Sequence, residues 1–296
     1  MLEKIKANIK GTILLHEQFG VSYLQLLKSF LMKDKMITIR TGDLIITTKI
    51  RKALYIAKSL GNIEKYGWKI IGTTDDLMIF ESEGIKLYSR LDDEAPYSSV
   101  INDVFIKETY RANVKDKVVI DVGAYRGESS IYFALQGAKK VIALEPDEEN
   151  FKIALRNIKE NGLENKITLL NKALAPNEGI INFYKYLHTS IANSTDPDNM
   201  DKLDDKIIIK QVEAITLRQI IEMAGEERIG LLKLDCEGCE YSALSSFSAF
   251  DRIDEIILEY HNGLQNLPDL LKSFGYELTI EKENKEKLGI IRARRV

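Results

Sequence analysis

Short apolar runs alternate with segments of helical periodicity over the second part of the chain. Residues 117–121, 141–145 and 167–170 are apolar runs typical of strands buried on both faces of a parallel sheet. Between them, apolar residues recur every three or four positions at 131–135 and 151–158, as in amphipathic helices. This alternation predicts a doubly wound, mostly parallel α/β sheet, and ligands of such sheets bind at the carboxyl ends of the strands.

The same reasoning extends to the end of the chain. Further strands are predicted at residues 180–184, 231–235, 256–259, 276–280 and 289–293, the last two as a hairpin. A helix at 267–274 ends at Gly275. Residues 185–206 are polar and aperiodic, which is typical of a lid or of a surface excursion. This segment contains polar side chains that could contact an acceptor: Tyr186, His188, Ser190 and Asn193.

The sequence pattern of the first part of the chain predicts a small mixed α/β domain. We place it at residues 1–98, with the second domain at 99–296. Its expected elements are helices at 23–31 and 51–60, strands at 37–39 and 44–47, and a hairpin of 77–80 with 85–88 around a four-residue loop. A helical pattern at 101–105 leads into the second domain. The small domain contains no catalytic motif, so packing or partner contact is its expected role.

Composition narrows the class of protein. The 296 residues include 42 Lys and Arg against 45 Asp and Glu, so the formal net charge is -3, and general nucleic-acid binding is not expected. Hydrophobic residues make up 45% and charged residues 29%, as in a soluble globular protein. The sequence contains no secretory signal and no apolar run of about 18 residues, so we expect a cytoplasmic protein without a membrane span.

A glycine-containing turn follows the first buried strand. Asp121 precedes Gly123 and Gly127, and glycines let the backbone turn sharply and approach a ligand. The spacing differs from the G-x-G-x-x-G fingerprint of dinucleotide sites. An acid at Asp121 would repel a pyrophosphate and suits a ligand with an ammonium group, such as S-adenosylmethionine. Glu145 ends the second strand, where an acid can accept hydrogen bonds from ribose hydroxyls. The alternative is a tight turn with two surface acids.

Ionisable residues also follow the later strands. Lys233 and Asp235 project to the same side of their strand because side chains alternate along a strand. We expect Asp235 to act as a general base or substrate anchor, with Lys233 adjusting its charge. Glu237, Glu259 and His261 are the further catalytic candidates. The alternatives are a structural Lys233–Asp235 ion pair, a helix-starting Glu237 and a histidine whose contacts are only structural.

The two cysteines, Cys236 and Cys239, are too few for a disulfide framework. A zinc site needs about two further ligands, and no second ligand pair occurs at zinc spacing. We therefore expect two small half-buried residues and no metal site. Spacing alone does not support a divalent cation at Asp235 and Glu259.

Four motifs, taken in order, resemble the FkbM-type S-adenosylmethionine-dependent methyltransferases. The resemblance runs from about residue 110 to residue 278. Its motifs are residues 119–124 with Gly127, residues 144–146, residues 171–174, and residues 233–235 with Glu237-Gly238 and Glu240-Tyr241. The resemblance implies a class I methyltransferase fold, a Rossmann-like sheet of about seven strands whose last strand is antiparallel. It also implies methyl transfer, most often to oxygen, on sugars, polyketides and related metabolites.

The resemblance also implies site residues. Asp121, Gly123, Ala124 and Gly127 match the loop around the methionine moiety of the cofactor. Further matches are Glu145 with Pro146 at the ribose, Lys172 with Ala173 along the adenine, and Asp235 beside the transferred methyl group. Tyr125 also belongs to the cofactor loop, although Tyr125 and Arg126 replace the pair usual there. Cys236 and Cys239 replace small or apolar residues, and residues 1–98 have no counterpart in the resemblance.

The expected function is therefore S-adenosylmethionine-dependent O-methylation of a sugar, glycolipid or other small metabolite. The expected partner is a small-molecule or glycan acceptor, and homo-oligomerisation stays open. One alternative is an RNA methyltransferase, such as one acting on tRNA, with the small domain as its recognition module. The acidic balance disfavours this alternative. The other is a methyltransferase-like domain that binds without catalysis, which the presence of Asp121, Glu145 and Asp235 disfavours.

Overall fold

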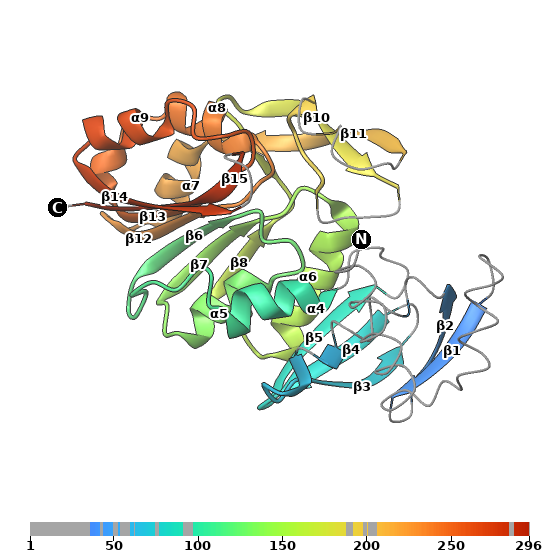
Figure 1. Ribbon diagram of the computed structural model, residues 1–296. Helices are drawn as coiled ribbons and strands as arrows, with labels where there is room; N and C mark the ends of the chain where they lie inside the picture. The colour runs from blue at the N-terminus through green and yellow to red at the C-terminus, as the bar shows by residue number, and fades with distance from the viewer. Residues whose placement is uncertain are drawn as a thin grey trace. The chain divides into compact units, whose positions relative to one another are not determined.

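The chain separates into two compact units, Met1–Thr109 and Tyr110–Val296. The boundary expected after residue 98 falls inside α4 (Tyr97–Ile101), a helix of the first unit. No described helix is long and apolar enough to cross a membrane. The computed structural model describes residues 36–41, 44–49, 53, 60–61, 63–74, 77–90, 97–187, 192–197, 200, 206–283 and 287–295 (Figure 1).

The first unit contains two antiparallel sheets. They are β1 (Met36–Thr41) with β2 (Leu44–Lys49), and β3 (Lys69–Thr74) with β4 (Leu77–Ser82) and β5 (Ile85–Arg90). These strands confirm those predicted near residues 37 and 44. In place of the helix expected at 101–105, α4 continues into a π-helix, η1 (Asn102–Ile106). The helix expected at 23–31 and most of that expected at 51–60 lie outside the described residues.

The hairpin of β4 and β5 has a shorter turn than predicted. Its strands reach Ser82 and resume at Ile85, so Glu83 and Gly84 alone form the turn instead of four residues. Both have positive φ angles, +50° and +84°. Two-residue hairpin turns with two positive φ angles favour Asn, Asp or Gly at both positions, and Glu83 lacks this signature. The expected loop length was therefore wrong.

A seven-stranded sheet forms the centre of the second unit. Its strand order is β14-β15-β13-β12-β6-β7-β8, and β15 alone runs antiparallel to the other strands. This confirms the predicted α/β class and the mostly parallel sheet with an antiparallel last strand. The strands are β6 (Val118–Val122), β7 (Lys140–Leu144), β8 (Ile167–Leu170), β12 (Ile229–Leu234), β13 (Ile253–Tyr260), β14 (Tyr276–Glu283) and β15 (Leu288–Arg295).

Helices cover both faces of this sheet. Figure 1 shows α5 (Glu128–Leu135) and α6 (Glu148–Glu160) on one face. On the other face lie α7 (Leu217–Ala224), α8 (Cys239–Ser245) and α9 (Leu267–Ser273). Residues of β6 and β12 are buried along their whole length, which explains their unbroken apolar sequence. Short helix η3 (Phe250–Arg252) precedes β13, and its buried Phe250 packs against Phe247 and Phe274.

A smaller sheet joins β9 (Ala173–Leu174), β10 (Gly179–Tyr186) and β11 (Ile207–Ile215) in the order β10-β11-β9. The strand expected at 180–184 is confirmed, whereas β11 was not predicted. The polar segment between β10 and β11 folds back near its middle, where Ser194 exchanges two backbone hydrogen bonds with Tyr184. His188 and Ser190 lie outside the described residues.

Candidate active site

Ionisable residues gather where the central strands end. Asp121 is the penultimate residue of β6, Glu145 directly follows β7, and Asp235 directly follows β12. Glu259 lies near the end of β13, and His261 follows that strand. Because these strands are parallel neighbours, their carboxyl ends meet at one edge of the sheet, as the alternating pattern predicted.

A buried ion pair connects β6 and β12 at this edge. Lys233 Nζ lies 3.1 Å from Asp121 Oδ1 and donates a hydrogen bond to the carbonyl of Gly123 at 2.7 Å. The hydroxyls of Ser129 and Ser130 donate to Asp121 Oδ2 at 2.7 and 2.6 Å. Asp121 is fully buried and Lys233 is 1% exposed. The Asp121 charge is therefore neutralised, and the argument that a free acid repels diphosphates at this position was wrong.

Tyr110 holds the carboxylate of Asp235. Its hydroxyl donates to Asp235 Oδ2 at 2.7 Å and lies 3.4 Å from Glu259 Oε2. Burial and the charge of Asp235 raise the pKa of Tyr110 well above its usual range, so this hydroxyl remains a donor. Lys233 Nζ lies 3.7 Å from Asp235 Oδ2 and 5.0 Å from the centre of the Tyr110 ring. Sequence reasoning missed Tyr110, and its one signal was that the family resemblance begins near this residue.

His261 lies among four carboxylates. Its Nδ1 is 3.2 Å from Glu240 Oε1, and its Nε2 is 3.3 Å from Glu237 Oε1. The same Nε2 is 3.8 Å from Asp235 and 3.9 Å from Glu259. Burial lowers the pKa of His261, but the charges of Glu237 and Glu240 outweigh it and raise the pKa well above the usual value. The imidazole is therefore a cation at neutral pH and balances part of the surrounding negative charge.

Burial also changes the proton state of Glu259. Burial, followed by the charge of Asp235, raises the pKa of Glu259 to about 8. At neutral pH most Glu259 side chains carry a proton, which lowers the charge that Lys233 and His261 must balance. The structure thus brings together all five residues predicted as catalytic: Lys233, Asp235, Glu237, Glu259 and His261.

The turn after β6 is tightly packed against the end of β12. Gly123 has a φ of +76°, and a Cβ atom there would lie 1.7 Å from the backbone oxygen of Asp235. Gly127 (φ +92°) is the N-cap residue of α5, and Tyr125 also has a positive φ of +52°. A side chain at Gly123 would collide with backbone, so the turn needs glycine there. The turn that resembles a cofactor loop therefore lies directly against Asp235.

Glu145 organises the loops that follow β6 and β7. Its Oε2 accepts from the Tyr125 amide and its Oε1 from the Asp147 amide, both at 2.9 Å. The Asn171 side chain donates to the carbonyls of Glu145 and Pro146, at 2.8 and 3.1 Å, and so connects the loop after β8. Burial, followed by the charge of Asp147, raises the pKa of Glu145 to about 8.

The remaining predicted cofactor residues lie on either side of Glu145. Ala124 is buried in the turn after β6, and Ala173 is buried at the start of β9. Lys172 forms an ion pair with Glu213 of β11 at 2.9 Å, so its ammonium group points toward the smaller sheet. The predicted cofactor residues therefore lie at the ends of four strands at one sheet edge: β6, β7 and β8, and β12 with Asp235.

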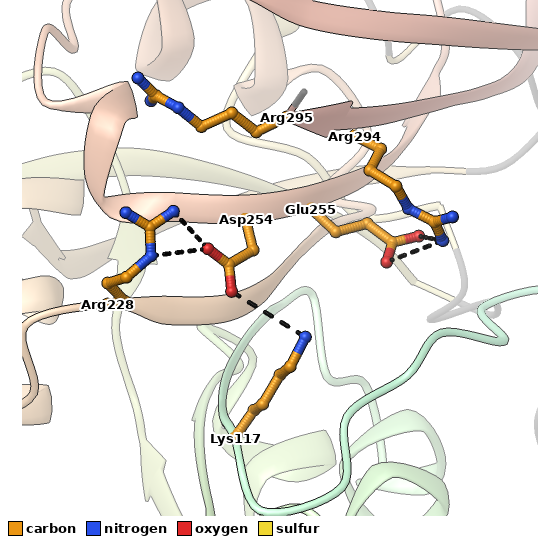
Figure 2. Close-up of a pocket in the computed structure, with 6 residues that line it drawn as sticks. All are labelled: Lys117, Arg228, Asp254, Glu255, Arg294 and Arg295. Carbon is orange, nitrogen blue, oxygen red and sulfur yellow. Dashed lines mark hydrogen bonds and ion pairs between the residues drawn. The ribbon is translucent and has the colours of Figure 1, made fainter.

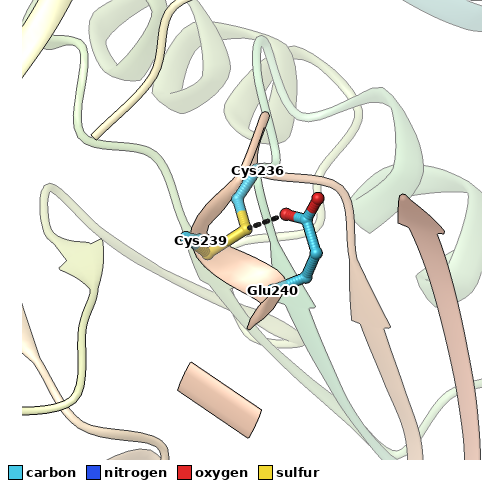
Figure 3. A group of neighbouring side chains, drawn as sticks. All are labelled: Cys236, Cys239 and Glu240. Carbon is cyan, nitrogen blue, oxygen red and sulfur yellow. Dashed lines mark hydrogen bonds between the residues drawn. A yellow bond between two sulfur atoms is a disulfide. The ribbon is translucent and has the colours of Figure 1, made fainter. Parts of the chain in front are cut away.

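Among the residues that the structure describes, two groups of side chains have the composition of metal ligands. Ligand atoms of Asp235, Glu259 and His261 all lie within 4.8 Å of one another, as do those of Cys236, Cys239 and Glu240. His261 would have to lose its proton in order to bind a metal ion. Cys236 and Cys239 are joined by a disulfide bond (Figure 3), which the sequence analysis did not predict. In this disulfide form, the cysteine group has no thiolate to offer a metal ion.

A cavity of about 410 Å³ lies at the opposite, amino edge of the sheet (Figure 2). Asp254 there pairs with Arg228 at 2.5 Å and with Lys117 at 3.9 Å, and Glu255 pairs with Arg294 at 3.3 Å. Arg295 completes the lining. The cavity contains no nucleophile or unpaired base, so we place the candidate active site at the carboxyl edge instead.

A family model and two curated proteins match parts of this chain. A family model described as "Methyltransferase FkbM domain" matches residues 121–278. Ribosomal protein L11 methyltransferase of Carboxydothermus hydrogenoformans is 47% identical over 58 residues, which cover 20% of this chain and 19% of that protein. Uncharacterized protein 158B of Sulfolobus islandicus rod-shaped virus 1 is 25% identical over 178 residues, covering 60% of this chain and 82% of that protein.

Among solved structures, methyltransferase FkbM from Methylobacillus flagellatus aligns with a TM-score of 0.44 and 15% identity. The alignment covers 67% of this chain and 48% of that one. The chain therefore spans about a fifth of the L11 methyltransferase and about half of the Methylobacillus protein.

Replacing Lys233 by methionine should lower the free energy of unfolding by about 3–5 kcal/mol, because Asp121 would be left buried and unpaired. The double variant Lys233→Met with Asp121→Asn should recover most of this loss. Urea denaturation of the single and the double variant measures both changes in the free energy of unfolding. Lys139→Met is the control: its exposed ion pair with Glu226 should contribute about 1 kcal/mol or less. A Lys233→Met loss no larger than that of the control would contradict the structural importance of the pair.

The stability of the protein should fall between about pH 5 and pH 8. The pKa of Glu259 is raised in the folded state, so its contribution is fully present below the unfolded value of 4.5 and is lost as pH rises through about 8. Glu259→Gln should reduce this decline by on the order of 1–3 kcal/mol. Urea denaturation at pH 5 and at pH 8 measures this decline in stability. The control variant is Glu164→Gln, a change at an exposed residue. An unchanged decline in the Glu259 variant would refute the assignment.

Proposed function

Because the family match covers more than half of its length, the chain belongs to the FkbM methyltransferase family, and we propose that it methylates a hydroxyl oxygen of a small metabolite with S-adenosylmethionine as donor. One observation carries this proposal. The carboxylate cluster of Asp235 directly abuts the turn at Gly123, so a proton acceptor lies beside the cofactor loop. A hydroxyl nucleophile needs such an acceptor within hydrogen-bond reach.

The chain offers suitable groups for the cofactor, which supplies a methyl group activated on a sulfonium sulfur. The tight turn at Gly123, Ala124 and Gly127 presents backbone close to the ligand. Each Glu145 oxygen accepts one backbone amide and has a further lone pair for a ribose hydroxyl. Pro146 and the 172–173 segment continue this edge toward the adenine. Asp121 acts from behind the turn, through its ion pair with Lys233.

Asp235 is the group we assign as general base. Tyr110 occupies Oδ2, whereas the nearest described contact of Oδ1 is His261 Nε2 at 3.8 Å, so Oδ1 can receive the acceptor's hydroxyl proton. Two positively charged groups lie beside Asp235: Lys233 Nζ at 3.7 Å from Oδ2 and the His261 cation, whose Nε2 is 3.8 Å from Oδ1. Tyr110 fixes the orientation of the carboxylate, and Glu237 and Glu259 surround the same position. This arrangement positions and deprotonates an acceptor, which is the main task of an enzyme whose methyl donor is already activated.

We further propose a sugar, glycolipid or other small metabolite as acceptor, in the cytoplasm. The net charge of -3 and the acidic cluster at the site favour such a molecule over the phosphate backbone of RNA. The acceptor experiment below also includes RNA, the alternative acceptor left open by the sequence.

Glu145→Ala should weaken binding of S-adenosylhomocysteine at least about tenfold, because the ribose hydroxyls would lose their acceptor. Isothermal titration calorimetry of the full chain measures this. Glu148→Ala is the matched control: its exposed side chain, close by in the sequence, pairs only weakly with Lys152 and should not alter the affinity. If neither S-adenosylmethionine nor its product binds the wild-type protein, the proposed donor is wrong.

Asp235→Asn should reduce kcat by about 10²–10⁴-fold while cofactor affinity stays within about twofold. Transfer of labelled methyl groups to hydroxylated metabolites, glycans and total RNA measures turnover and identifies the acceptor class. Asp251→Asn, an exposed change at the opposite edge of the sheet, is the control. Unchanged turnover in Asp235→Asn refutes the base assignment, and methylation of RNA alone refutes the small-molecule acceptor. Cofactor binding without any transfer would indicate a binding domain.

A further inference from the structure

A disulfide bond lies immediately beside the proposed base. It joins Cys236 to Cys239, the two residues that flank Glu237 and Gly238 in the turn after β12 (Figure 3). The chain has two cysteines, and both are in this bond. A disulfide stabilises a fold less when it closes a shorter loop, and this loop is only four residues long. Stability therefore gives little reason for a disulfide at this place.

We propose that Cys236 and Cys239 form a redox site that controls the carboxylate cluster and the cofactor loop, with the disulfide as the form of higher affinity. The effect on methyl transfer rests on the proposed function above. The effect on the protein's own structure does not, and it can be measured without any cofactor. Three sets of contacts lead from the sulfur atoms to the site.

The first set runs through Glu240. This fully buried side chain lies with Oε2 3.4 Å from Cys236 Sγ, and the same oxygen accepts from the Gly238 amide at 2.9 Å. Its other oxygen lies 3.2 Å from His261 Nδ1. A disulfide sulfur has no hydrogen to donate, whereas a Cys236 thiol at this distance would donate to Glu240. Reduction therefore gives Glu240 a further hydrogen-bond donor, which competes with His261 for the Glu240 carboxylate.

The second set runs through Glu237, one of the four residues in the loop that the disulfide closes. Glu237 has a positive φ of +55°, a conformation that costs energy for a residue with a side chain. Its carboxylate lies 3.3 Å from His261 Nε2, and its carbonyl accepts from the Ser194 hydroxyl. Opening the loop lets Glu237 relax to an ordinary φ. That movement withdraws one carboxylate from His261 and disturbs the contact with Ser194 of the polar segment.

The third set reaches the cofactor loop. A Cβ atom on Gly123 would lie 1.7 Å from the Asp235 oxygen and 3.4 Å from Cys236 Cα. The backbone of residues 235 and 236 thus packs directly on the turn after β6, with no side chain between them. A shift of the backbone at Cys236 must be accommodated by this turn, because packed interiors leave few voids.

The redox step is an ordinary exchange with a dithiol reductant. A reductant thiolate attacks Sγ of Cys236, which is half-buried, and breaks the sulfur–sulfur bond; Cys239, 3% exposed, leaves as a thiolate and takes up a proton. The second reductant sulfur then attacks the mixed disulfide and releases Cys236. The reductant departs as a cyclic disulfide, so two electrons and two protons have passed to the cysteines.

The test compares the oxidised full-length protein with the same protein reduced by dithiothreitol. Thiol titration should count zero and two thiols, and calorimetry should show S-adenosylhomocysteine binding about fivefold or more weakly to the reduced form. The Cys236→Ser, Cys239→Ser double variant should bind as the reduced protein does and should not respond to dithiothreitol. Because the chain has no other cysteine, any response of the wild type comes from this pair. Equal affinities of the two forms, with the thiol counts as stated, would overturn the proposal.

Hydrogen–deuterium exchange without cofactor separates this proposal from the proposed function. Reduction should accelerate exchange in peptides that cover residues 235–241, 121–127 and 192–197. If S-adenosylhomocysteine binds neither form but these three segments respond, the proposed cofactor is wrong and the redox site stands. A response limited to residues 236–239, no response, or two free thiols after treatment with oxidised glutathione would overturn the redox site.

Discussion

The buried ion pair between Lys233 and Asp121 holds the carboxyl edge of the sheet together. The two residues lie opposite each other in the register of β12 and β6, the central neighbours of the seven strands. Each charge is removed from water and needs the other as its partner. The same ammonium group also donates to the Gly123 carbonyl, and Asp121 receives the hydroxyls of Ser129 and Ser130. One pair thereby fixes two strand ends, the turn between strand and helix, and the beginning of α5.

From this pair, the alternation of side chains along β12 determines the candidate active site. Asp235 follows Lys233 by two residues and lies on the same side, within 3.7 Å of its ammonium group. The carboxylate of Glu237 adds negative charge, which the His261 cation offsets, and the raised pKa of Glu259 keeps that side chain mostly neutral. The groups are held by partners before any ligand arrives, so little reorganisation is needed at the moment of reaction.

The sequence was sufficient to predict the sheet and the residues at its edge, because both follow from local pattern. Unbroken apolar runs predicted β6, β7 and β12, and the resemblance placed Glu145 and Asp235 at the strand ends where the structure has them. The pairing of Lys233 with Asp121 was not predicted, because strand order and register bring together residues that are far apart in sequence. Pattern alone therefore located the ionisable residues without showing which of them neutralise one another.

Tyr110 and the disulfide illustrate two different limits of such reasoning. Tyr110 lies 125 positions before Asp235, and only the folded chain brings its hydroxyl to that carboxylate. The two cysteines are close in sequence, but a C-x-x-C spacing is compatible with metal ligation, free thiols or a disulfide, so the choice depends on the surrounding side chains. In the folded chain the two cysteines are joined in a disulfide, and the buried carboxylate of Glu240 lies 3.4 Å from Cys236 Sγ. The disulfide leaves no thiolate for a metal ion, and the spacing of the cysteines alone could not have shown this.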